Sequence, residues 1–128
     1  LSKELDFSPA DRAEHLRRVA HICRILNDQG IITICSFISP NENIRNQVAE
    51  IIGKERFHMI FMDSDLDYSM KNKPGLYKLA EQGKVSGLPG IDISYEKPEN
   101  PSLICKPNLN NLQAIINFLQ ENRIFPAS

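Results

Sequence analysis

Four side chains that could bind a small anion lie close together near the start of the sequence. The stretch DRAEHLRR contains Arg12, His15, Arg17 and Arg18. An arginine guanidinium presents a planar set of N–H donors that suits an oxyanion such as phosphate or sulfate. Charged residues on a helix are also common as a solvated face. The pattern by itself therefore indicates either an anion site or a charged surface.

A second group of candidate site residues follows two predicted strands. The apolar runs IITICSF at 31–37 and FHMIFM at 57–62 are typical of strands in a parallel sheet. Ligands of such sheets bind at the edge where the strands end. The residues expected at that edge are Ser39, Pro40, Asn41, Arg45, Asp63 and Ser64. The helix that follows Ser39 should direct its first amides to the same edge, which is an anion-binding arrangement. Asp63 can equally be a strand-end cap.

The remaining elements should place these residues in one α/β domain, residues 1–128, with a doubly wound parallel sheet and helices on both faces. Ser8 and Pro9 predict the start of a helix that ends before Gly30. Further helices are expected at about 43–52, 66–70 and 75–81, and a last strand at 103–105. Asn108 is a candidate cap for a final helix ending near 121. The Gly- and Pro-rich segment 83–101 is the predicted lid loop.

Composition narrows the classes of partner. The 128 residues carry a net charge of -1, which argues against nucleic acid or an anionic membrane as the main partner. No apolar run reaches the ~18 residues of a membrane span, and no signal peptide is visible. Cys23, Cys35 and Cys105 stand in apolar contexts without metal-ligand spacing. We expect them to be buried, reduced thiols in a cytoplasmic protein.

Several segments resemble the adenylylsulfate kinase family, in the same order and over nearly the whole chain. LDFSPADRAEHLRRVA is similar to the family pattern GFSxxDRxENIRR, and SFISP, GLYK and GIDISYEKPENP resemble later family motifs. The resemblance implies a P-loop kinase fold. It also implies ATP-dependent phosphorylation of the 3′-hydroxyl of adenosine 5′-phosphosulfate, the step of sulfate activation, with ATP and Mg as the nucleotide and metal.

The resemblance also assigns roles to residues on the acceptor side. Phe7 would stack against the adenine, and Arg12 would hold the phosphosulfate. His15 stands where the family usually has Asn and would lie beside the same ligand. Ile38 and Ser39 would offer backbone contacts to it.

Other positions depart from the family pattern. Arg45 stays in register, but SPNENIR replaces SPYRxDR around it. In KNKPGLY, Lys71 replaces the Arg that the family places near the ATP base, and Pro74 replaces its Lys near the reacting phosphates. Lys73 is the neighbouring cation that could compensate for the lost charge. Leu88 replaces a Phe of the lid, which keeps apolar contact and loses stacking worth on the order of 1 kcal/mol.

The phosphate-binding loop GxxxxGK[ST] does not occur in the 128 residues. In the family this loop, its strand and an acidic segment precede the residues that match Leu1. We therefore expect ATP and Mg to be held mainly by a preceding segment. The chain itself should contain no catalytic residue or metal ligand and be inactive alone.

These departures leave three hypotheses for the function. The first is an adenylylsulfate kinase. The second is a kinase for a related nucleotide, such as a cytidine diphosphoramidate of capsule biosynthesis. The third is a degenerate, noncatalytic domain for nucleotide binding or dimerisation. The expected partner is a small nucleotide, and a homodimer or a fusion to a sulfurylase-type domain fits the family.

Overall fold

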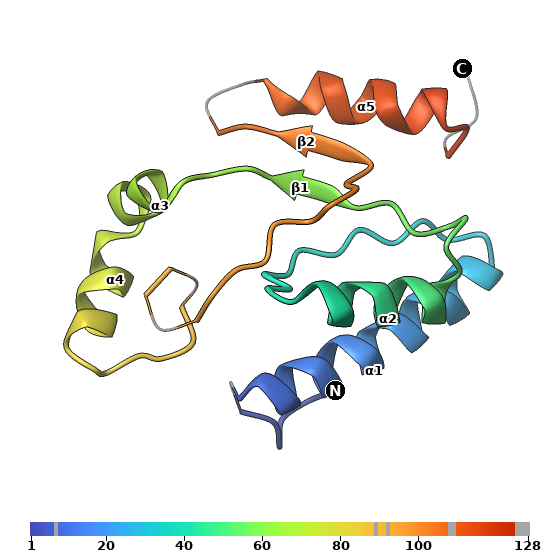
Figure 1. Cartoon of the computed structure of the whole chain (residues 1–128). Helices are drawn as coiled ribbons and strands as arrows, with labels where there is room; N and C mark the ends of the chain where they lie inside the picture. The colour runs from blue at the N-terminus through green and yellow to red at the C-terminus, as the bar shows by residue number, and fades with distance from the viewer. Residues whose placement is uncertain (7, 89, 92, 108–109, 125–128) are drawn as a thin grey trace. The chain divides into compact units, whose positions relative to one another are not determined.

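The computed structural model describes residues 1–6, 8–88, 90–91, 93–107 and 110–124. The elements are α1 (Pro9–Asp28), α2 (Glu42–Ile52), β1 (Ile60–Met62), α3 (Leu66–Asn72), α4 (Pro74–Glu81), β2 (Leu103–Cys105) and α5 (Asn111–Glu121), drawn in Figure 1. They form two compact units. The first contains Leu1–Phe57 and Lys73–Lys97, and the second contains His58–Asn72 and Pro98–Ser128.

Helix α1 begins and ends where its capping residues predict. The Ser8 hydroxyl accepts a hydrogen bond from the Asp11 amide at 3.2 Å. The Asp11 carboxylate in turn accepts from the Asp6 amide at 3.1 Å, so the acid ties the preceding chain to the first turn. Gly30 follows the helix with φ 78°, a conformation that glycine adopts without steric cost.

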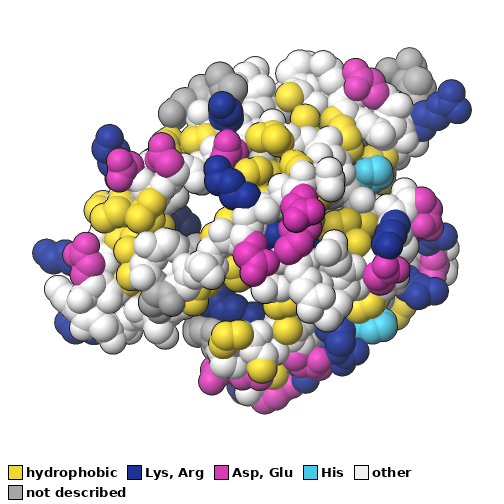
Figure 2. Space-filling view, in the orientation of Figure 1, with side chains coloured by type: hydrophobic (Ala, Val, Ile, Leu, Met, Phe, Trp, Pro, Cys, Tyr) yellow, Lys and Arg dark blue, Asp and Glu magenta, His cyan; other side chains and the backbone are white. Residues whose placement is uncertain are grey.

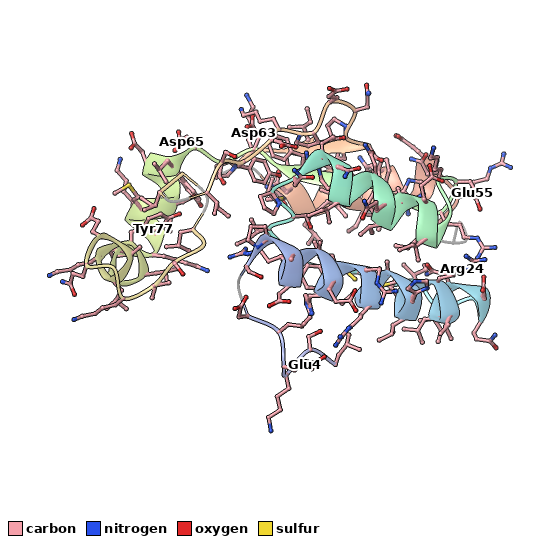
Figure 3. All side chains as sticks on the ribbon, turned by 60° about the horizontal axis from the view of Figure 1, so that its bottom comes forward. Glu4, Arg24, Glu55, Asp63, Asp65 and Tyr77 are labelled. Atoms are coloured by element: carbon pink, nitrogen blue, oxygen red, sulfur yellow. The ribbon has the colours of Figure 1, made fainter. Side chains whose placement is uncertain are left out.

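Helices α1 and α2 pack side by side in the first unit (Figure 1). The buried apolar residues of α1 are Leu16, Ala20 and Cys23, which recur at helical spacing on one face. At the far end of the pair, Arg24 of α1 donates to the carbonyl of Ile51 in α2 at 3.3 Å. Figure 3 labels Arg24 at this position. The apolar stripe thus marks the face of α1 that is buried in the first unit.

The segment 31–37 is not a strand, which corrects the prediction from its β-branched composition. Among the described residues, no ladder hydrogen bonds hold it. Its apolar side chains are open to solvent, with Ile34 88% and Phe37 45% exposed. A strand is defined by pairing with a neighbour, and composition alone cannot supply that neighbour. The expectation that Cys35 is buried is also wrong, since its side chain is exposed.

The second unit contains the sheet. Strands β1 and β2 are parallel, with Ile60 opposite Leu103 and Met62 opposite Cys105. The predicted strand at 57–62 is thus shorter than expected, whereas 103–105 is confirmed. Helix α5 lies on β2, beginning at Asn111. Asn108, the predicted cap, lies outside the described residues.

The predicted lid loop 83–101 contains no helix or strand in its described part. Hydrophobic side chains reach the visible surface of both units, interspersed with charges of both signs (Figure 2). No helix in the described part of the chain is long and apolar enough to cross a membrane.

Candidate functional site

The first unit contains a pocket with a volume of about 410 Å³. Its lining residues come from α1, from the segment before α2, from α4 and from the lid loop: Arg12, Ile38, Leu76, Lys84, Val85, Ser86, Gly87 and Leu88. Pockets for small organic ligands usually measure about 300–1,000 Å³ and combine apolar walls with a few polar groups. This pocket has that size and that lining.

Two cations, Arg12 and Lys84, stand among the apolar walls. Arg12 also donates from Nη2 to the carbonyl of Gly87 at 2.8 Å, so it connects α1 to the lid loop. A guanidinium carries its N–H donors in a planar array that matches an oxyanion. The pair therefore makes the pocket suited to an anionic ligand with an apolar or aromatic portion.

The pocket includes residues that sequence reasoning missed. Lys84 is the one with clear chemical consequence, and Leu76, Val85, Ser86 and Gly87 complete the lining. The available signal was a cation inside a predicted ligand lid. It was not sufficient, because a loop without periodicity does not tell which of its side chains face inward.

Ile38 lines the pocket, and the next residue, Ser39, has a positive φ of 41°. That conformation is uncommon for a residue with a side chain and must be held by its surroundings. Here Arg45 donates from Nη1 to the Ser39 carbonyl at 2.6 Å. The turn that positions Ile38 at the pocket is therefore fixed by a side chain from the following helix.

Arg45 lies outside the pocket and is only 4% exposed. It pairs with the carboxylate of Glu42 and donates to the carbonyl of Glu96 at 2.6 Å. Its guanidinium carbon stands 5.7 Å from the ring centroid of Tyr95. Burial raises the pKa of Tyr95, an effect that the Arg45 charge opposes. These groups satisfy a buried charge that would otherwise be costly, so Arg45 is a structural cross-link between α2 and the end of the lid loop.

The start of α2 binds an anion, but the anion belongs to the protein. The Glu96 carboxylate accepts from the Glu42 amide at 2.7 Å and from the Asn41 side chain at 3.1 Å. The Asn41 side chain caps the Ile44 amide at 3.2 Å. The predicted anion site at this helix start is therefore filled by Glu96, because a carboxylate is stabilised by the unpaired amides and dipole of the first turn.

The other predicted site residues are distributed more widely. Leu88 lines the pocket. His15 contacts the Ser2 hydroxyl at 2.7 Å and the ring of Phe37 at 5.5 Å between centroids. Phe7 lies outside the described residues.

The predicted residues of the ATP side and of the sheet edge lie elsewhere. Lys71 is in α3 of the second unit, and the exposed Lys73 precedes α4 in the first unit. Asp63 directly follows β1, as Figure 3 shows, and its amide donates to the Cys105 carbonyl at 2.8 Å. The pocket thus unites Arg12, Ile38 and Leu88 but not these three residues.

Together these features define an α/β protein with a pocket that suits an anionic small molecule. A sequence model of the adenylylsulphate kinase family matches residues 1–106. The adenylyl-sulfate kinase of Clostridium kluyveri is 37% identical over 118 residues, covering 91% of this chain and 59% of that protein. The counterpart from Bacteroides thetaiotaomicron is 38% identical over 122 residues, covering 94% and 61%.

A solved structure agrees with the sequence comparison. The Mycobacterium tuberculosis APS kinase CysC, in complex with AMPPNP and APS, superposes with a TM-score of 0.85 at 33% identity, covering 91% of this chain and 71% of that one. The chain belongs to the adenylylsulphate kinase family, and the predicted α/β fold of P-loop kinase type is confirmed. It spans about three-fifths of the length of the two curated relatives, 59% and 61%.

Proposed function

We propose that this chain supplies the acceptor-binding half of an ATP-dependent kinase that phosphorylates the 3′-hydroxyl of adenosine 5′-phosphosulfate. The observation that carries this proposal is the pocket in which Arg12 and Lys84 stand among the apolar walls. The phosphosulfate would take the cations, and the nucleoside would take the apolar side at Ile38 and Leu88. Family membership and the relative solved with AMPPNP and APS support the same assignment.

Phosphoryl transfer of this kind is achieved mainly by positioning and by charge stabilisation. In the proposal, Arg12 orients the acceptor by gripping its anionic end. The backbone turn at Ser39, held by Arg45, fixes the part of the pocket wall that Ile38 forms. No group of three or more His, Cys, Asp or Glu in the described part of the chain could hold a metal ion. In the proposal the magnesium ion enters with ATP, because Mg²⁺ is usually held by one or two carboxylates together with the substrate phosphates.

Calorimetry with adenosine 5′-phosphosulfate tests the assignment. Arg12→Ala should weaken binding by about 1.5–3 kcal/mol, the range for a hydrogen bond to a charged group, which corresponds to about 10- to 150-fold in Kd. Arg24→Ala is the matched control, because it removes the same side chain from α1 at its other end. Equal affinity in the wild type and the Arg12 variant would remove Arg12 from the site, and absence of binding to the wild type would refute the proposal.

A related acceptor is the competing assignment, and Leu88 is the residue that favours it. An aliphatic side chain lines the pocket where the resemblance implies a stacking Phe. A cytidine diphosphoramidate should therefore be titrated in parallel. Phosphotransfer from MgATP to each acceptor should be assayed with the protein that the complete gene encodes. Tighter binding of the cytidine ligand would replace the adenylylsulfate assignment. Binding without any phosphotransfer would favour the noncatalytic alternative.

We further propose that the chain works as part of a larger enzyme. The bifunctional enzyme NodQ of Rhizobium tropici is 42% identical over 107 residues, covering 83% of this chain and 17% of NodQ. This relative supports a fusion of the kinase domain to a second enzyme as one form in which the chain works.

A further inference from the structure

Two of the three cysteines lie next to each other in the first unit. Cys23 lies on the buried face of α1 and is 5% exposed, whereas Cys35 is exposed on the segment 31–37. Their sulfur atoms are 3.5 Å apart. The third cysteine, Cys105, is 1% exposed within β2 of the second unit. One thiol pair thus joins a helix to a neighbouring segment, and the remaining thiol is inside the sheet.

We propose that Cys23 and Cys35 form a reversible disulfide bond, which makes this pair a site of oxidative modification. A disulfide has a sulfur–sulfur distance of about 2.05 Å, so the two atoms must approach by roughly 1.5 Å. Cys35 can make this movement at low cost, since no ladder hydrogen bonds hold residues 32–37 within the described part of the chain. Cys23 is fixed by its place in the helix and can remain where it is.

The exposure of the two thiols sets the order of the reaction with an oxidant such as glutathione disulfide. The thiolate of the accessible Cys35 attacks one glutathione sulfur, forms a mixed disulfide and releases one glutathione. The sulfur of Cys23 then attacks the Cys35 sulfur, the protein disulfide forms and the second glutathione leaves. Two protein thiols are oxidised, one glutathione disulfide is reduced to two thiols, and the protons pass to the solvent and the leaving groups.

The thiol of Cys35 is a slow first nucleophile, because partial desolvation of its sulfur, which lies against Cys23, and the contact with that thiol raise its pKa to about 11. Its thiolate is therefore scarce at neutral pH, whereas the second step is intramolecular between sulfur atoms already in contact. The bond would attach the segment leading to Ile38 to the helix that contains Arg12. This inference rests on the sulfur geometry alone and is independent of the proposed kinase function.

The test is incubation of the whole chain with excess glutathione disulfide at pH 8.5, followed by thiol counting and peptide mass mapping. The count should fall from three free cysteines to one, with a Cys23–Cys35 peptide lighter by two hydrogens and Cys105 still reduced. The thermal unfolding midpoint should rise, because the cross-link restricts the unfolded chain. Dithiothreitol should reverse both changes.

The matched control is the double change Cys35→Ser with Ser36→Cys, which moves the thiol one residue away from the sulfur contact. It should accumulate a mixed disulfide and no internal bond. A stable mixed disulfide at Cys35 in the wild type, an unchanged thiol count, or pairing that involves Cys105 would overturn the proposal. Because the readout is the bond itself, its failure leaves the assignment of the nucleotide pocket unaffected.

Discussion

Two regions of the first unit contrast sharply: the cross-link around Arg45 and the apolar segment 31–37. Arg45, a charged residue, is 4% exposed, whereas Ile34 is 88% exposed. The order is the reverse of what residue type predicts. Arg45 is buried because carbonyls and a carboxylate satisfy its guanidinium. Ile34 is exposed because no described segment covers its side chain. Partners, more than polarity, decide burial here.

The largest effect is expected from removing the buried charge. Arg45→Ala should lower the free energy of unfolding by about 2–4 kcal/mol, since it leaves the carbonyl of Ser39 and the carboxylate of Glu42 without their main donor. Urea denaturation of the wild type and the variant measures this change. Arg24→Ala, at a partly solvated contact on α1, should change stability by less than about 0.5 kcal/mol. Equal effects of the two changes would show that the buried contacts of Arg45 contribute no more to stability than the exposed contact of Arg24.

A smaller effect is expected from the cap that the lid loop supplies to α2. Glu96→Gln removes the charge that accepts from the Glu42 amide and should cost about 1 kcal/mol. Protection of the first α2 amides from hydrogen exchange should fall with it. Glu99→Gln, a change of an exposed carboxyl three residues later in the sequence, is the control. Unaltered amide protection in the Glu96 variant would contradict the capping contact.

Truncation of the exposed segment tests the other side of the comparison. Ile34→Ala should change the free energy of unfolding by less than about 0.5 kcal/mol, because the side chain is already 88% exposed. Leu16→Ala, in the buried stripe of α1 and 8% exposed, should cost about 2–3 kcal/mol. A large loss for Ile34→Ala in chemical denaturation would mean that a second molecule or another segment covers this face in solution.

The smallest effect is a pH dependence on the solvated face of α1. Hydrogen bonds from Arg17 and Arg18 lower the pKa of Glu14 from 4.5 to about 2. Because the folded pKa is depressed, the stabilisation is present above pH 4.5 and is lost as the pH falls toward 2. Glu14→Gln should weaken the pH dependence of the thermal unfolding midpoint between pH 4.5 and 2. Glu81→Gln on α4 is the control and should leave that dependence as it is in the wild type. An identical slope in both variants would show that the ion pairs contribute nothing measurable.

Local signals in the sequence determined where the helices lie and which helix, α1, contributes Arg12 to the pocket. Ser8, Pro9 and Gly30 define α1 because capping acts over three or four residues. Arg12 could be selected because it lies in a recognisable pattern on that helix. The turn at Ser39 and the strand at 103–105 were also predictable, since short motifs and apolar runs specify them.

Tertiary structure alone decided the rest. Glu96 caps a helix start that lies 54 residues earlier in the chain, and Arg45 reaches a carbonyl 51 residues away. Lys84 enters the pocket from a loop without periodicity, and the Cys23–Cys35 contact joins a helix to a segment predicted as a strand. Residues 31–37 have strand composition but pair with no other described segment, because pairing requires a partner that local sequence cannot provide. Helices satisfy their backbone within themselves, whereas sheets, buried charges and pockets depend on distant neighbours.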